Sequence, residues 1–268
     1  MGLRNAQENA RVRVRPGEYV ESLTVATPGV ELVSEARHQA RITGEVTLTG
    51  DHARLVGFHI QGLHRGDHWV EVRCLLGCGV SGNRMSDLLC AGDCAGIRVA
   101  GGGASVAIED NELDQLTGRL TVGVQVSNGS DHIIVRNQVT NISSGAGRDA
   151  YGILAGGAGL TIAGNTLQTL TGTGAGAAVG IKLSGVFDAV VVDNDIEEVT
   201  GGPGPGVSGR GVGIQLGSVS RAEVLRNEVT RVAGGVGGAD GDMGGSATGV
   251  WVDASTGVEL ADNVLSLV

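Results

Sequence analysis

Four cysteines carry the most distinctive chemistry in this sequence. Cys74 and Cys78 form one pair, Cys90 and Cys94 form another, and all four lie within 21 residues. Four thiolates can hold a tetrahedral zinc ion, but three residues separate the members of each pair, not the two of the usual zinc knuckle. The spacing favours local disulfides, Cys74–Cys78 and Cys90–Cys94, or buried thiols over zinc, and we expect no metal and no cofactor. Disulfides would fit an exported protein.

A charged group surrounds the first cysteine pair in the sequence. Its core is Glu71, Arg73 and Arg98. Three further ionisable residues lie near them in the sequence: Asp67, His68 and Asp93. Two interpretations are open, a salt-bridge network on a solvated face that needs no function, and a site for an acidic sugar. The first is preferred, because exposed ion pairs are common on protein surfaces.

A repeat determines where these residues lie. A Gly followed by apolar, variable and apolar residues recurs at Gly96, Gly123, Gly152, Gly180, Gly213 and Gly249. Each Gly is followed after 13 to 15 residues by an Asn, and an earlier copy begins with Trp69 in place of Gly. The resulting series is Asn83, Asn111, Asn137, Asn165, Asn194, Asn227 and Asn263. Successive Asn residues are 26 to 36 positions apart, a period typical of a solenoid.

Each repeat predicts three short strands. The Gly-led strand alternates inward and outward, a second strand precedes the Asn, and a third strand follows it. We therefore predict an all-β, right-handed parallel β-helix of roughly nine coils over residues 12–268. Residues 1–11 are expected to cap it, with residues 3–10 as a short helix. The Asn residues are expected at a corner, where their side chains bond buried turn amides, as scaffold and not as catalytic groups.

Composition excludes several classes of function. The net charge of −10 and the absence of a concentrated basic face argue against a nucleic-acid partner. No window of 18 apolar residues occurs, so we expect no membrane span. The first residues lack the apolar core of a signal peptide, which leaves a cytosolic protein or a trimmed segment of a longer secreted one. The cysteines and the repeat favour an extracellular or cell-surface location.

The opening segment resembles a known family. Residues 12–25, with Pro16-Gly17-Glu18-Tyr19 after a short strand, resemble the first coil of pectin-lyase-like right-handed parallel β-helix proteins. Residues 55–60 resemble a further coil of that family, in which Gly57 is expected at the corner that later coils give to Asn. The resemblance covers residues 12–268 and implies the fold. It leaves the activity open, because the same fold serves lyases, hydrolases, adhesins and phage spikes.

The outer face of the Gly-led strands is the candidate ligand face. Its polar and aromatic positions are Glu71, Arg73, Arg98, Gln125, Lys182, Gln215, Trp251 and Asp253. A glycosidase needs two carboxylates about 5 to 10 Å apart, whereas Glu71 and Asp253 are expected six coils apart. Trp251 could stack on a sugar or serve an interface. The clusters that mark the enzymes of the resembled family are not found.

Two functional hypotheses follow from these observations. The first is a non-enzymatic structural or adhesive β-solenoid, as a segment of a bacterial cell-surface protein. The second is a polysaccharide-active lyase or hydrolase that acts on acidic sugars. The expected partners are a polysaccharide and a second copy of the chain, in contact through an uncapped last coil after Asn263.

Overall fold

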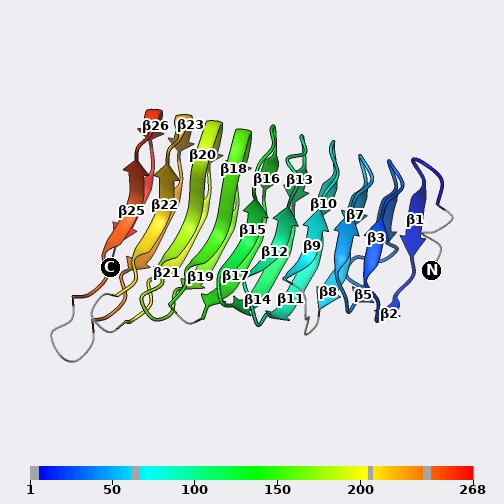
Figure 1. Ribbon diagram of the computed structural model, residues 1–268, viewed down its shortest axis with the longest axis horizontal. Helices are drawn as coiled ribbons and strands as arrows, with labels where there is room; N and C mark the ends of the chain where they lie inside the picture. The colour runs from blue at the N-terminus through cyan, green and yellow to red at the C-terminus, as the bar shows by residue number, and fades with distance from the viewer. Residues whose placement is uncertain (1–5, 62–66, 146, 205–207, 238–242, 268) are drawn as a thin grey trace.

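The structure is a computed structural model that describes residues 6–61, 67–145, 147–204, 208–237 and 243–267. Strands stack along one axis, and the first and last described coils lie at opposite ends of an elongated molecule (Figure 1). Within the described residues, nine complete coils follow a partial first coil, and each coil contributes three strand segments. The prediction of an all-β parallel β-helix with three strands per coil is confirmed.

The first segment of each coil is the Gly-led strand. Seven of these segments are separate strands: β3 (Leu23–Val25), β6 (Val46–Leu48), β9 (His68–Val72), β12 (Cys94–Val99), β15 (Thr121–Val126), β22 (Gly211–Gly217) and β25 (Ala247–Asp253). In two coils the first and second segments merge into one long strand, β18 (Ala150–Ala163) and β20 (Ala178–Val192).

The second segment leads to the Asn corner. Its separate strands are β1 (Arg11–Val14), β4 (Glu31–Ser34), β7 (Arg54–Val56), β10 (Gly79–Ser81), β13 (Ala107–Glu109), β16 (Ile133–Val135), β23 (Ser220–Leu225) and β26 (Thr256–Ala261). First and second segments together form a 17-stranded parallel sheet.

The third segment forms a separate sheet of ten parallel strands. These strands are β2 (Gly17–Tyr19), β5 (Ala40–Ile42), β8 (His59–Gln61), β11 (Arg84–Leu89), β14 (Glu112–Gly118), β17 (Gln138–Ser144), β19 (Thr166–Thr171), β21 (Asp195–Thr200), β24 (Glu228–Ala233) and β27 (Val264–Leu267). Their inward residues are three positions apart, as in Leu113 and Leu116, because Gln115 between them takes the left-handed conformation with φ of 59°. That local bulge turns both leucines to the core.

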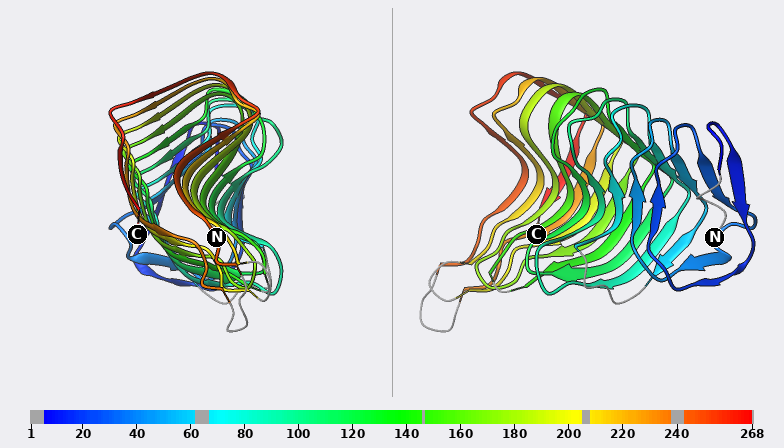
Figure 2. Two further views of the ribbon diagram at one scale, coloured as in Figure 1. Left: turned by 90° about the vertical axis from the view of Figure 1, so that its left-hand side faces the viewer. Right: turned by 45° about the vertical axis from the view of Figure 1, so that its right-hand side comes forward.

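The Gly at the start of each repeat allows a close approach. A Cβ atom at Gly96 would lie 2.6 Å from Leu113 Cδ2 and 2.7 Å from the carbonyl oxygen of Gly123. Gly96 itself has no partner in the strand register, since Ala95 pairs with His68 and Ile97 pairs with Val70. The first strands bend here, and the side of the solenoid that they form is concave (left view of Figure 2). We call the outer surface of the first strands the concave face.

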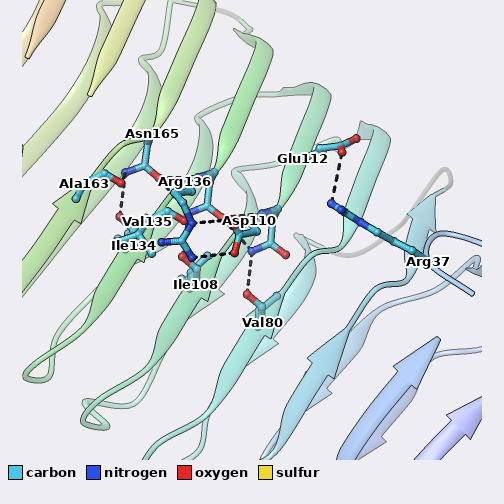
Figure 3. A network of polar contacts seen from close by, with 12 residues as sticks. Arg37, Val80, Ile108, Asp110, Glu112, Ile134, Val135, Arg136, Ala163 and Asn165 are labelled. Carbon is cyan, nitrogen blue, oxygen red and sulfur yellow. Dashed lines mark hydrogen bonds and ion pairs between the residues drawn. The ribbon is translucent and has the colours of Figure 1, made fainter. Parts of the chain in front are cut away.

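The Asn ladder links neighbouring coils at the corner between the second and third strands. Asn137 is typical, because its Nδ2 donates to the carbonyl of Ile108 at 2.9 Å and to Asn165 Oδ1 at 3.0 Å. Its own Oδ1 accepts the backbone N–H of Asn111 at 3.1 Å. Figure 3 shows part of this series beside the charged residues of the same corner. The ladder pairs backbone groups that are buried away from water.

One corner differs from the sequence prediction. Phe58, not Gly57, occupies the position of the Asn column, and its backbone N–H donates to Asn83 Oδ1 at 2.9 Å. Gly57 lies one residue earlier with φ of 77°. Phe58 is fully buried, so an aromatic ring fills the corner where no Asn is present.

The two ends differ in how they are covered. Residues 6–10 form a turn, not the expected helix, although Ala6 packs against the core; residues 1–5 of the predicted cap lie outside the described residues. In the last coil Leu260 and Leu265 are about half exposed, at 49% and 48%. The described residues hold no helix with the length and apolar character needed to cross a membrane.

We predict that Asn137→Ala lowers the free energy of unfolding by about 3 kcal/mol, because it leaves the Asn111 amide and the Ile108 carbonyl buried without partners. Urea denaturation followed by circular dichroism measures this change. Asn263→Ala, at the partly exposed last position of the ladder, should cost only about 1 kcal/mol, since water can reach the freed groups. Equal losses at both positions would contradict the role given to burial.

Candidate functional site

The concave face carries its side chains in columns that run along the solenoid. Glu71 of β9 is in register with Arg98 of β12, which is in register with Gln125 of β15. The same column continues through the later coils with Leu154, Lys182, Gln215 and Trp251. Asp253 ends a second column, beside Gly217. The outward positions predicted from the repeat therefore lie along one surface, and Glu71 and Asp253 stand at its opposite ends.

A charged cluster occupies the N-terminal part of this face. Glu71 Oε2 lies 2.7 Å from Arg73 Nε and 3.7 Å from His68 Nε2. His68 also lies 3.9 Å from Glu45, a residue that the sequence interpretation did not include. The expectation of a solvated face is wrong for Glu71, whose side chain is only 5% exposed, whereas its ion pair with Arg73 agrees with the expected salt-bridge network. A buried carboxylate of this kind depends on its arginine partner.

Asp93, expected near this cluster, and Arg98, expected in its core, form no salt bridge with Glu71 among the described residues. Asp93 pairs with Arg119 of the next coil at 2.8 Å, and this bond lowers the pKa of Asp93. Arg98 stacks beside Glu71 in register, but its buried Nε has no hydrogen-bond partner among the described residues. Arg98 therefore retains hydrogen-bonding capacity at the face.

A second polar group lies in the middle of the concave face and was missed by sequence reasoning. The Tyr151 hydroxyl donates to Asp149 Oδ2 at 2.6 Å, and Lys182 Nζ donates to the same hydroxyl at 3.5 Å. Burial, followed by the hydrogen bond to Asp149, raises the pKa of Tyr151 further above its ordinary value of 10.0, at which the hydroxyl is already protonated at neutral pH. The sequence contained one signal for this polar group: at the position just before the repeat Gly, Tyr151 stands where the neighbouring repeats have an aliphatic residue.

An apolar strip lies under these polar groups, outside the main core. Its buried members are Ala95, Val122, Tyr151, Val179 and Val212. Leu154 and Trp251 pack against it from the outer column, and the Arg210 guanidinium lies 4.7 Å from the centroid of the Trp251 ring. Trp251 is therefore partly buried and stacked, where the sequence suggested a lone exposed ring. The face combines an apolar floor with cations above aromatic rings.

A pair of carboxylates lies elsewhere, on the outer side of the third strands. Asp195 of β21 is in register with Glu228 of β24, one coil away. Burial and the nearby Glu228 raise the pKa of Asp195. Sequence reasoning sought such a pair only on the Gly-led strands. Next to it Arg231 binds both Glu197 and Glu198, so this surface is a network of paired charges.

The cysteines join in two local disulfides, Cys74–Cys78 between β9 and β10 and Cys90–Cys94 between β11 and β12. All four are buried at two corners of the same coil. Because each sulfur is bonded to another, none is available as a zinc ligand. In the part of the chain that the structure describes, no group of three or more His, Cys, Asp or Glu side chains is placed to hold a metal ion.

Residues 95–266 match the sequence model of the right-handed β-helix region family, and the chain belongs to that family. No curated protein is significantly similar in sequence.

Two solved tailspike structures share the fold. The enzymatically active domain of bacteriophage CBA120 tailspike protein 2 matches with a TM-score of 0.62 and 12% identity, over 97% of this chain and 39% of that one. The Dettilon tailspike protein matches with a TM-score of 0.50 and 12% identity, over 96% of this chain and 61% of that one. The catalytic unit of an α-1,3-glucanase from Streptomyces thermodiastaticus has a TM-score of 0.41 and 13% identity, over 96% of this chain and 65% of that one. This chain thus spans less than two thirds of each.

Asp195 of β21 and Asp193 at the corner before it have pKa values that are shifted in opposite directions. Replacing each with a neutral residue should therefore change the free energy of unfolding in opposite directions. Because its pKa is raised in the folded state, the contribution of Asp195 to stability is fully present below its unfolded pKa of about 3.9 and is lost as pH rises through the folded value. Asp195→Asn should therefore increase the free energy of unfolding at neutral pH, with no gain in acid. Asp193 has a lowered pKa because of its bond to Arg226, so Asp193→Asn should destabilise at neutral pH and lose that effect as pH falls through the folded pKa. Urea midpoints across this pH range measure both; two changes of the same sign would refute the assignment.

Proposed function

We propose that this chain is an adhesive, non-hydrolytic β-solenoid that binds an acidic polysaccharide along its concave face, outside the cell. The fold presents a straight surface across successive coils about 4.8 Å apart, which suits an extended polymer. The glycan would lie along the solenoid axis, with its carboxylates toward the cations of the face. The similarity to phage tailspikes supports a surface location for a chain of this shape.

The observation that carries this proposal is a local reversal of charge. The whole chain has 19 Lys and Arg residues against 29 Asp and Glu residues. The two outer columns of the concave face instead hold the cations Arg73, Arg98 and Lys182 against the acids Glu71 and Asp253. Glu71 is buried and bound to Arg73, so Arg98 and Lys182 supply the positive field at the N-terminal and middle coils, which Asp149 beside Lys182 and Asp253 in the last coil partly offset.

One aromatic ring on the same face is placed to contact a sugar ring. Trp251 is partly exposed, packs on the apolar strip and has the Arg210 guanidinium beside it. The apolar side of a sugar ring can pack against such a surface while its carboxylate meets the cation. Hydrolysis is not proposed, because the two acids of these columns stand six coils apart, beyond the range of a glycosidase pair.

We predict that Lys182→Gln weakens binding of polygalacturonate or alginate oligosaccharides by about tenfold, since one charge-assisted hydrogen bond is lost. Isothermal titration calorimetry at low and high salt measures the affinity. Lys182→Arg keeps the charge and should retain most of the binding. The distant control is Arg231→Gln, which also removes one positive charge but lies on the third-strand face, and it should leave the affinity unchanged. Equal loss in both Gln variants would refute the concave face.

A β-eliminating lyase is the second candidate, favoured by the Tyr151 hydroxyl between Asp149 and Lys182. The hydroxyl can donate its proton to the leaving oxygen of a glycosidic bond, but its raised pKa makes it a weak general acid. The proton next to the uronate carboxyl must also be removed by a base, and the neighbouring carboxylate, Asp149, already accepts hydrogen bonds from the Tyr151 hydroxyl and the Ala177 amide. The lyase therefore ranks below the binding protein.

Incubation with polygalacturonate or alginate decides between the two. A lyase forms a carbon–carbon double bond and its product absorbs in the ultraviolet, whereas a binding protein leaves the polymer intact. If the wild-type chain forms such a product, Tyr151→Phe should abolish it while polymer binding remains. We expect no product from either protein, and its formation by the wild type would overturn the non-enzymatic proposal.

A further inference from the structure

A hollow of about 590 Å³ lies on the corner between the second and third strands, away from the concave face. Gly57 and Gly82 form part of its lining, and Arg37, Glu112 and Arg136 stand around it. Figure 3 shows Arg37 reaching toward Glu112 at one side, and Arg136 against Asp110 at the other. The hollow spans several neighbouring coils in the N-terminal half of the solenoid.

The hollow lies where two neighbouring coils both have glycine at the position before the corner. The residue before each corner position takes the left-handed conformation, with φ of 77° at Gly57, 62° at Gly82, 54° at Asp110 and 53° at Arg136. The last two carry polar side chains at this position, so the backbone there does not demand glycine. A Cβ atom at Gly82 would have no heavy atom within 4 Å. The glycines therefore open a space that the fold would allow to be filled.

One side of the hollow is a fixed pair of charges. Arg136 Nε donates to Asp110 Oδ1 at 2.7 Å, and Arg136 Nη2 donates to Asp110 Oδ2 at 2.9 Å. This two-bond geometry holds both side chains in place across adjacent coils. The carboxylate keeps further lone pairs, and the guanidinium keeps further N–H groups, for a ligand.

On the opposite side of the hollow, the charged groups of Arg37 and Glu112 face each other without a direct hydrogen bond. Arg37 Nη2 lies 3.8 Å from Glu112 Oε1, and Arg84 Nε lies 4.0 Å from Glu112 Oε2. Both distances exceed those of a charge-assisted hydrogen bond, about 2.7 to 2.9 Å. A hydroxyl group about 2.8 Å from both Arg37 and Glu112 would accept from the first and donate to the second. The gap between them thus matches a group that is donor and acceptor at once.

The remaining lining is mixed in polarity. Val33 and Val56 present apolar surface, and the Gln138 amide is in register with Glu112. Two arginines, Arg37 and Arg136, balance two carboxylates, so the hollow has no strong preference for an anion or a cation. A ligand with hydroxyls around its rim and an apolar ring face satisfies each part of this lining.

From this geometry we infer that the corner hollow binds a neutral, hydroxyl-rich sugar unit of a glycan. The site is independent of the proposed binding of acidic polymers, because it lies on another side of the coil and uses none of the same residues. A chain with both surfaces would hold neutral and acidic units of carbohydrate at the same time. A volume of several hundred Å³ is of the size that small-molecule sites have.

Filling the hollow without disturbing the fold tests this inference. Gly82→Gln places a neutral side chain into it, and Gln115 shows that glutamine takes the left-handed conformation in this chain. Gly164→Gln is the matched control, because Gly164 occupies the same corner column with φ of 61° and does not line the hollow, although a Cβ atom there would contact the outer side of Arg136 at 3.7 Å. Thermal melting followed by circular dichroism should show equal, small losses of stability in the two variants.

Binding is measured by fluorescence anisotropy with end-labelled maltopentaose, cellopentaose and mannopentaose. We expect the wild-type chain and Gly164→Gln to bind at least one of them, and Gly82→Gln to bind it at least about tenfold more weakly. Glu112→Gln should weaken the same interaction, and Lys182→Gln should not. Absence of binding to all three sugars at millimolar concentration, or equal binding by Gly82→Gln and Gly164→Gln, would overturn the inference. Loss of acidic-polymer binding alone would count only against the concave face.

Discussion

The structure depends on the stacking of each coil in register on the next. In a parallel β-helix the backbone hydrogen bonds of a strand go to the preceding and following coils, so a coil cannot shift without losing them. The Asn ladder applies the same rule to the corner, where Asn165 bonds the backbone and side chain of its neighbours in both directions. Every side chain is thereby placed in a column with its counterparts.

This register explains why the interior and the surface have such different freedom. Inward columns must be filled by apolar groups that pack on one another, as with Ile97, Ile153 and Ile181, which are all fully buried. Outward columns have no such requirement, so their content can vary from coil to coil. Function in such a molecule therefore arises from the order of residues along an outward column and from the places where a column is interrupted.

Glycine creates both kinds of surface feature in this chain. At the Gly-led position it lets the third-strand leucine approach the first strand, which bends that strand and makes one face concave. At the Asn corner, Gly57 and Gly82 remove the side chains that Asp110 and Arg136 supply in later coils. The first use shapes a long surface with aromatic rings and cations, and the second leaves a local hollow with paired charges.

The sequence alone determined the period, the three strands, the inward columns and the Asn corner, because stacking imposes a pattern that is visible in residue spacing. It also placed Glu71, Arg98, Lys182 and Trp251 on one outer surface. The tertiary structure decided that Glu71 is buried, that Tyr151 meets Lys182, and that Phe58 takes a corner position. Burial and side-chain contact depend on how strands bend and on which groups of neighbouring coils meet, and a register specifies order without specifying curvature.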